Sequence, residues 1–125
     1  MDLQPIEIAR LPEPAPDWLP QDATAERHHA ALHGATVVGE AARRSLSVRV
    51  GIWIDEAGRV HQARWRGAED PSLRACAEAA CRLLESGVDP QCLDAATISL
   101  AVPSTGCRER SEVVASALEA ALALR

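Results

Sequence analysis

Cys107 is the residue of this chain whose type and position most favour chemistry. It follows the loop-forming stretch "VPSTG" and begins the Ala- and Leu-rich segment at the end of the sequence, directly before Arg108. The first turn of a helix presents unpaired N–H groups and the positive end of the helix dipole, and both stabilise a thiolate. The sequence therefore predicts that Cys107 is the most readily alkylated of the four cysteines. A small apolar residue at a helix start is the alternative that the sequence leaves open.

The other three cysteines lack such a setting. Cys76 and Cys81 are five residues apart on one predicted helix, so their side chains point in different directions and cannot jointly bind one metal ion. We predict that both are small buried apolar residues. Cys92 lies in a connection, and the chain contains no C-x-x-C pair, so the cysteine pattern does not indicate a disulfide framework.

Two histidines have a spacing that can hold zinc. The stretch "DATAERHHAALHG", residues 22–34, predicts a short helix with Asp22 as its N-cap, and on this helix His29 and His33 are four residues apart. Such pairs also occur by chance on helix surfaces, so a solvated face remains the alternative. His61 alternates outward on a predicted strand, where we expect a solvent-facing side chain.

Several function classes lack sequence support. There is no nucleophile elbow, no Cys/His/Asn context and no glycine-rich phosphate loop, and the acidic residues are scattered. We therefore do not expect an enzyme. The net charge of −5 does not indicate a nucleic-acid or anionic-membrane surface. Neither a signal segment nor an apolar run of about 20 residues is present, so we expect a cytoplasmic protein and no membrane partner.

The remaining pattern predicts one domain behind a proline-rich arm. Residues 1–21 contain "LPEPAPDWLP", which is incompatible with a helix or a central strand. Residues 22–125 have a length typical of one domain with its own core. Within them, apolar residues alternating with polar or small ones predict strands near 36–41, 46–54 and 59–66. The sequence "DEAG" predicts the hairpin turn between the second and third strands.

Helix signals follow the strands. Asp70 and Pro71 predict the start of a helix over 71–86, with Gly87 as its end. Its predicted buried face consists of Leu73, Cys76, Ala77, Ala80 and Leu84. A connection with a short helix or turn leads to a final helix over 107–123. The predicted fold class is α+β: a small antiparallel three-stranded meander with helices packed on one face.

Three stretches resemble one known family. They are "VRVGIWIDEAGRVHQARWRG" in the hairpin, "AEDPSLRACAEAACRLLESG" in the first long helix and "LAVPSTGCRERSEVVASALEAAL" at the end. In order and spacing, the segment from Gly39 to Arg125 resembles the NifU/IscU family of iron–sulphur cluster assembly scaffolds. The resemblance implies the same fold and a role in cluster assembly. It also implies a cysteine desulphurase or other cluster-assembly proteins as partners.

The resemblance also implies a site, which this chain matches only in part. The family holds its cluster, or a zinc ion, with three cysteines and an aspartate. The first cysteine corresponds to Arg43 or Arg44, and the second corresponds to Asp70 or Pro71. The third is retained as Cys107, the position that receives sulphur in the family.

The family's other site residues are also replaced. The aspartate corresponds to Ser45 or Leu46, and the histidine before the last cysteine corresponds to Gly106. An arginine in place of the first cysteine cannot ligate iron, but it could pair with a thiolate. The ligand set that remains for an iron–sulphur cluster or zinc consists of Cys107 and Asp70, together with His29 and His33 from the segment that packs near the site in the family.

These observations leave three hypotheses. The first is a scaffold-like cluster assembly protein with an incomplete cluster or zinc site centred on Cys107. The second is a metal-free relative that retains the fold as a binding or regulatory partner. The third is a thiol or persulphide carrier that uses Cys107 alone.

Overall fold

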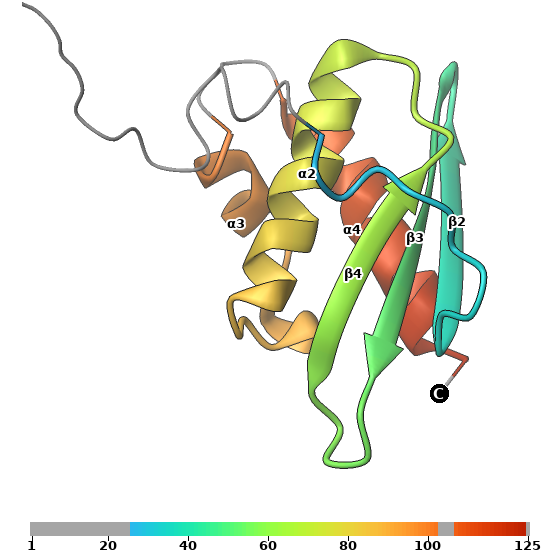
Figure 1. The fold of residues 1–125 in the computed structure, drawn as a ribbon. Helices are drawn as coiled ribbons and strands as arrows, with labels where there is room; N and C mark the ends of the chain where they lie inside the picture. The colour runs from blue at the N-terminus through green and yellow to red at the C-terminus, as the bar shows by residue number, and fades with distance from the viewer. Residues whose placement is uncertain (1–25, 103–106, 125) are drawn as a thin grey trace, which may run out of the picture.

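A three-stranded antiparallel sheet forms one layer of the domain. The computed structural model describes residues 26–102 and 107–124. The strands are β2 (Val37–Arg43), β3 (Leu46–Ile54) and β4 (Val60–Arg66), and they lie in the order β2-β3-β4 (Figure 1). The predicted meander is therefore confirmed, with strand ends within two residues of the predicted ones. The arm predicted at residues 1–21 lies outside the described residues.

Local turn chemistry fixes the hairpin between β3 and β4. The Oδ1 atom of Asp55 accepts hydrogen bonds from the backbone N–H groups of Ala57 and Arg59, both at 2.9 Å. Gly58 has a φ of 84°, a conformation that side-chain-bearing residues rarely adopt. The stretch "DEAG" thus forms the turn that the sequence predicted, because Asp and Gly each supply what this tight turn requires.

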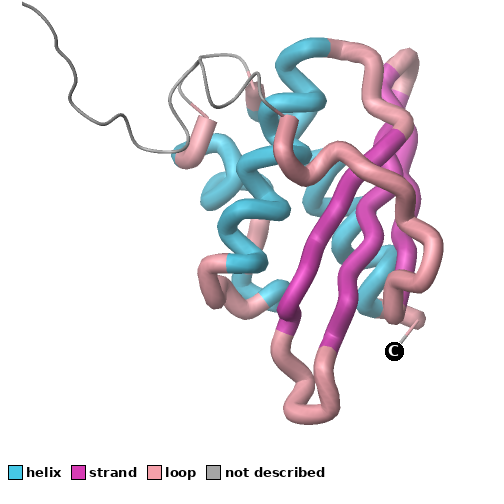
Figure 2. Tube along the Cα trace, in the orientation of Figure 1, coloured by secondary structure: helices cyan, strands magenta, loops and turns pink. Residues whose placement is uncertain are grey.

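Helices cover one face of the sheet (Figure 1; Figure 2). They are α2 (Pro71–Glu85), the short 3-10 helix η2 (Pro90–Cys92), α3 (Ala95–Leu100) and α4 (Arg108–Leu122). α2 packs mainly on β4 and α4 packs on β2 and β3, while α3 contacts α2 and α4. The arrangement is the α+β class that the sequence predicted. No helix of the described part of the chain combines the length and apolar character needed to cross a bilayer.

α2 begins and ends where its sequence signals predict. The side chain of Asp70 accepts a hydrogen bond of 2.9 Å from the backbone N–H of Leu73, and Pro71 occupies the first turn. The helix ends at Glu85 with Ser86 as its C-cap, and Gly87 follows with a φ of 112°. All five residues of its predicted apolar face are buried: Leu73, Cys76, Ala77, Ala80 and Leu84.

α4 lies unusually close to β2. A Cβ atom placed on Gly39 would lie 1.9 Å from the carbonyl oxygen of Ala117 and 2.3 Å from the backbone nitrogen of Ala121. Glycine on the strand and alanine on the helix therefore let the two backbones approach each other. This contact sets the position of α4, and with it the position of Cys107 at its start.

The predicted helix over 22–34 is wrong for residues 26–34, and residues 22–25 are not described. Residues 26–34 form turns and extended backbone, beginning with Glu26 at a φ of 50°. Trp65 exchanges backbone hydrogen bonds with His28 and Ala30, so the segment pairs with the edge of β4. Helix propensity is a weak preference, and here contacts with the sheet override it.

Candidate thiol site at the tip of the domain

The β2–β3 turn lies against the start of α4. Arg43 Nη1 donates to Glu112 Oε1 at 2.7 Å, and Arg44 Nη1 lies 3.5 Å from Glu109 Oε2. Both glutamates belong to the first two turns of α4. Arg43 and Arg44, the alternatives that the resemblance places at the first cysteine, are therefore engaged in ion pairs at the same end of the domain as Cys107.

Asp70 joins the start of α2 to the same region. Its Oδ2 atom accepts a hydrogen bond of 2.8 Å from Arg110 Nε while also capping α2 at Leu73, and Arg110 Nη2 lies 3.4 Å from Oδ1. The hydrogen bond from Arg110, followed by the bond from Leu73, lowers the pKa of Asp70. The structure thus uses Asp70 as a helix cap and an ion-pair partner.

Cys107 lies at the N-cap of α4 and is largely enclosed. Only 4% of the residue is exposed, and its backbone carbonyl accepts the first helical hydrogen bond, from Ser111, at 2.8 Å. Its side chain does not cap the helix. Arg110 lies near this thiol: the pKa of Arg110 is raised by Asp70 first, and Cys107 adds a smaller contribution. Cys107 is therefore a buried helix-start thiol near Arg110, whose charge is paired with Asp70.

A second cysteine lies beside Cys107. Cys76 Sγ is 3.6 Å from the hydroxyl of Ser111, which is one helical turn after Cys107 on α4, and Ser99 donates to that hydroxyl at 2.8 Å. Burial raises the pKa of Cys76 to about 12, and the neighbouring Cys107 adds to the rise. The sequence predicted a buried, structural Cys76; the structure confirms the burial and places this thiol next to Cys107.

The remaining cysteines differ in exposure. Cys81 is fully buried, and burial raises its pKa well above the ordinary value. Cys92, in η2, is exposed. The prediction that Cys81 is a small buried residue is confirmed.

The two histidines of the predicted zinc pair lie on the extended segment. The ring of His29 stacks on Trp65 with a centroid separation of 4.4 Å, and the His33 side chain is exposed. Since residues 29–33 are not helical, the four-residue spacing no longer places both rings on one face. Among residues 26–102 and 107–124, no group of three His, Cys, Asp or Glu side chains could hold a metal ion.

A buried ionic cluster that no sequence pattern predicted lies beneath this segment. Glu78, in the middle of α2, is only 1% exposed. It accepts hydrogen bonds from the backbone N–H of His28 (3.0 Å), from His28 Nδ1 (2.6 Å) and from Trp65 Nε1 (3.1 Å). The sequence feature that could have indicated this cluster is the glutamate inside the apolar run "ACAEAAC", because a carboxylate on a buried helix face requires hydrogen-bond or ion-pair partners.

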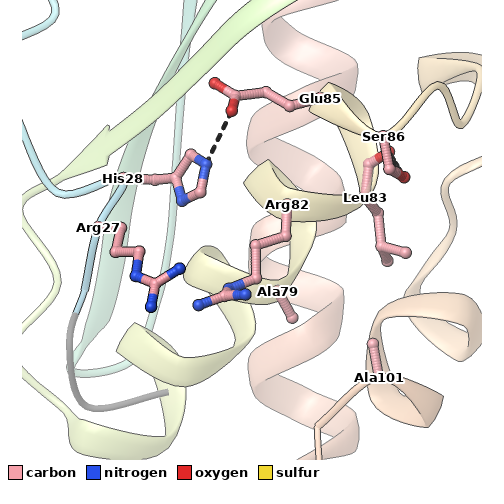
Figure 3. Close-up of a pocket in the computed structure, with 8 residues that line it drawn as sticks. All are labelled: Arg27, His28, Ala79, Arg82, Leu83, Glu85, Ser86 and Ala101. Atoms are coloured by element: carbon pink, nitrogen blue, oxygen red, sulfur yellow. Dashed lines mark hydrogen bonds and ion pairs between the residues drawn. The ribbon is translucent and has the colours of Figure 1, made fainter. Parts of the chain in front are cut away.

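The cluster continues to the end of α2. His28 Nε2 donates to Glu85 at 2.9 Å (Figure 3), and Glu85 also accepts hydrogen bonds from Arg64 (2.5 Å) and from the backbone of Ala63 (2.8 Å). The hydrogen bond with Glu78 raises the pKa of His28 against the opposing effect of burial, and Glu85 raises it further. His28 therefore lies between two carboxylates, which favour its protonated form.

The tip and the ionic cluster are two places where the described chain gathers reactive or charged side chains. The tip joins Cys107, Cys76 and Asp70 through Arg110 and Ser111 of α4. Comparison of the chain with known proteins adds no family to this description, because no family model and no characterised protein matches the sequence.

Proposed function

We propose that the chain is a scaffold-like protein of the iron–sulphur cluster assembly type, in which the incomplete site at Cys107 carries sulphur as a persulphide. This combines the first and third of the hypotheses drawn from the sequence. The observation that carries it is the engagement of Asp70, whose carboxylate is held by Arg110 and by the cap of α2 beside a retained Cys107.

The tip does not supply the donors of a cluster. Iron–sulphur clusters and structural zinc sites each need about four protein ligands. Arginines 43 and 44 cannot serve as ligands, and Asp70 would have to leave both Arg110 and the backbone of Leu73. The possible ligands that remain in this part of the described chain are Cys107 and Cys76. Two thiols are too few for a cluster, whereas one thiol is enough to carry a persulphide.

Persulphide transfer requires only a thiolate at Cys107. This thiolate attacks the outer sulphur of a donor persulphide, R–S–SH. A new S–S bond forms at Cys107, the donor's S–S bond breaks, and the donor leaves as the thiolate R–S⁻. No external oxidant or reductant is needed.

Access to Cys107 requires local opening. The first turn of α4 has no side-chain cap, and a helix start without one is typically about 1 kcal/mol less stable than a capped start. Fraying of this turn would expose the Cys107 thiol without unfolding the domain. A cysteine desulphurase, the partner that the resemblance implies, would act as the sulphur donor by contacting this end of the domain.

The proposal is tested by sulphur uptake. The full chain is incubated anaerobically with a cysteine desulphurase and cysteine, and separately with glutathione persulphide, and its peptides are then mapped by mass spectrometry. The peptide that contains Cys107 should gain one sulphur atom. Cys107→Ser should abolish the gain, while the matched control Cys92→Ser should leave it unchanged.

A second arm distinguishes the alternatives. The chain is reconstituted anaerobically with iron and sulphide, and separately with zinc, followed by metal analysis of the wild type and of Cys107→Ser. Stoichiometric iron and sulphide that depend on Cys107 would replace the carrier proposal with a true scaffold. Absence of both sulphur uptake and bound metal would leave the metal-free binding partner.

A further inference from the structure

Two thiols from different helices meet at the start of α4. Cys76 belongs to the buried face of α2, Cys107 is the N-cap residue of α4, and these two helices pack against each other (Figure 1). Cys76 is fully enclosed, whereas Cys107 retains a small exposed fraction. Helix packing brings the two residues together, because they lie far apart in the sequence.

Ser111 shows how closely the two thiols approach. Its hydroxyl lies 3.6 Å from Cys76 Sγ, and its backbone N–H donates to the carbonyl of Cys107 at 2.8 Å. Residues four apart on a helix lie on the same face, so Cys107 and Ser111 face α2 together. The pKa of Cys76 agrees with this placement: burial raises it to about 12, and a hydrogen bond and charge from Cys107 add to the rise. The two side chains are therefore neighbours.

A bond between these sulphurs requires only a small movement. An S–S bond is about 2.05 Å long, so neighbouring thiols must approach each other by about 1–2 Å to form it. The start of α4 allows this movement, because the Cys107 side chain does not cap the helix and its rotation breaks no capping bond. Cys107 also makes a further contact, but disulfide formation uses only its sulphur and needs no unpaired charge.

We propose that Cys76 and Cys107 are a dithiol pair that a peroxide converts to a disulfide, which joins α2 to the start of α4. A small neutral oxidant of this class suits two enclosed thiols, which larger oxidants do not reach. The proposal goes beyond sulphur transfer, because it gives Cys76 a chemical role and requires no persulphide. The disulfide would also stop sulphur uptake at Cys107, and that consequence alone rests on the proposed function.

Two steps balance the reaction. The sulphur of Cys107 attacks one oxygen of hydrogen peroxide, the O–O bond breaks, and a sulphenic acid forms while the other oxygen leaves as water. The sulphur of Cys76 then attacks the sulphenic sulphur. The S–S bond forms, the S–O bond breaks, and the hydroxyl leaves as a second water with the proton of Cys76. Both thiols are oxidised and the peroxide is reduced.

Thiol counting tests whether the pair closes. The Cys92→Ser chain is used, because exposed Cys92 would otherwise link one chain to another. The folded, reduced chain is treated with hydrogen peroxide, and the remaining thiols are alkylated in urea and counted by mass spectrometry. Of the four cysteines this chain keeps three, and the alkylated thiols should fall from three to one. Dithiothreitol should restore all three.

Peptide mapping identifies the partners. Trypsin, Glu-C and Asp-N together place Cys76, Cys81 and Cys107 on separate peptides. After oxidation, peptide 75–78 should be joined to peptide 94–108, and reduction should separate them.

Two variants on α2 provide a matched comparison. Cys76→Ala and Cys81→Ala each remove one fully buried thiol from the same helix. In the Cys92→Ser chain, Cys76→Ala should abolish the link to peptide 94–108, whereas Cys81→Ala should leave it unchanged. Urea unfolding of the reduced variants verifies that the fold is retained. The peptide link in the Cys92→Ser chain itself does not depend on either variant.

The proposal is overturned if peroxide leaves three alkylatable thiols, or if it converts Cys107 to a sulphinic or sulphonic acid without an S–S link. It is also overturned if Cys81 becomes linked to Cys107 as readily as Cys76, which would indicate pairing in unfolded chains. None of these results bears on sulphur uptake, which is measured separately with a persulphide donor.

Discussion

His28 Nδ1 lies 2.6 Å from Oε2 of Glu78, a residue fifty positions later in the sequence. This contact fastens the extended N-terminal segment to the buried middle of α2. Glu78 is almost completely enclosed, so its charge depends on the hydrogen bonds from His28 and Trp65 and on the ion pair with Arg82. The pair therefore couples the attachment of residues 26–30 to the ionisation of both side chains.

The first prediction concerns the pH dependence of folding. His28 has a pKa raised above its ordinary 6.5, so its stabilising effect is present below pH 6.5 and is lost as the pH rises through the raised value. For Glu78, burial raises the pKa, but the hydrogen bonds from His28 and Trp65 outweigh burial and lower it from 4.5 to about 2. Its stabilising effect is present above pH 4.5 and is lost as the pH falls toward 2.

The free energy of unfolding should therefore be highest between about pH 4.5 and 6.5 and should decline on both sides. Urea unfolding across this range measures it. His28→Gln should flatten the decline on the alkaline side, whereas His33→Gln, a change at an exposed residue, should leave the profile unchanged. An unaltered alkaline decline in His28→Gln would show that another group titrates there.

The second prediction concerns the contact between β2 and α4. Gly39→Ala would place a methyl group inside the backbone of α4, so unfolding should become easier by about 2–3 kcal/mol. Gly51→Ala is the control. Its new Cβ would lie 3.1 Å from Leu32 Cδ2, which can rotate, and 3.1 Å from Ala35 Cβ, which moves only with its backbone, so the cost should be about 1 kcal/mol and smaller than for Gly39→Ala. Equal losses in urea unfolding would mean that α4 does not pack this closely.

The third prediction concerns the order of cysteine alkylation. The sequence alone predicts Cys107 as the fastest cysteine, but the structure encloses it and exposes Cys92. Under native conditions, a brief iodoacetamide pulse should modify Cys92 first and Cys107 more slowly, with Cys76 and Cys81 last. Peptide mapping at several pulse times measures this order. Modification of Cys107 ahead of Cys92 would show that the first turn of α4 opens more readily than its packing indicates.

The fourth prediction separates the two roles of Asp70. Asp70→Asn keeps an oxygen that can cap α2 but removes the charge that pairs with Arg110, so it should cost less than about 1 kcal/mol. Asp70→Ala removes both contacts and should cost about 1–2 kcal/mol. Thermal or urea unfolding of the two variants compares them. If the two losses are the same, the cap contributes little to the start of α2.

The sequence by itself determined the elements whose signals are local. Alternating apolar residues defined β3, the Asp and Gly of "DEAG" defined its turn, and Asp70 with Pro71 defined the start of α2. Each of these signals acts within a few residues, through backbone geometry or a nearby hydrogen bond. The α+β class follows from the order of such elements, because only packing the helices on the sheet buries both apolar faces.

Only the tertiary structure decided the state of the residues whose partners lie far along the chain. Residues 26–34 have helix-forming composition, yet His28 and His29 meet Glu78 and Trp65, and these contacts hold the segment extended. Cys107 has the local features of a reactive thiol, but the packing of α4 on the sheet encloses it. Burial and long-range ion pairs depend on which surfaces pack together in the fold. The local periodicity of the sequence does not specify that packing.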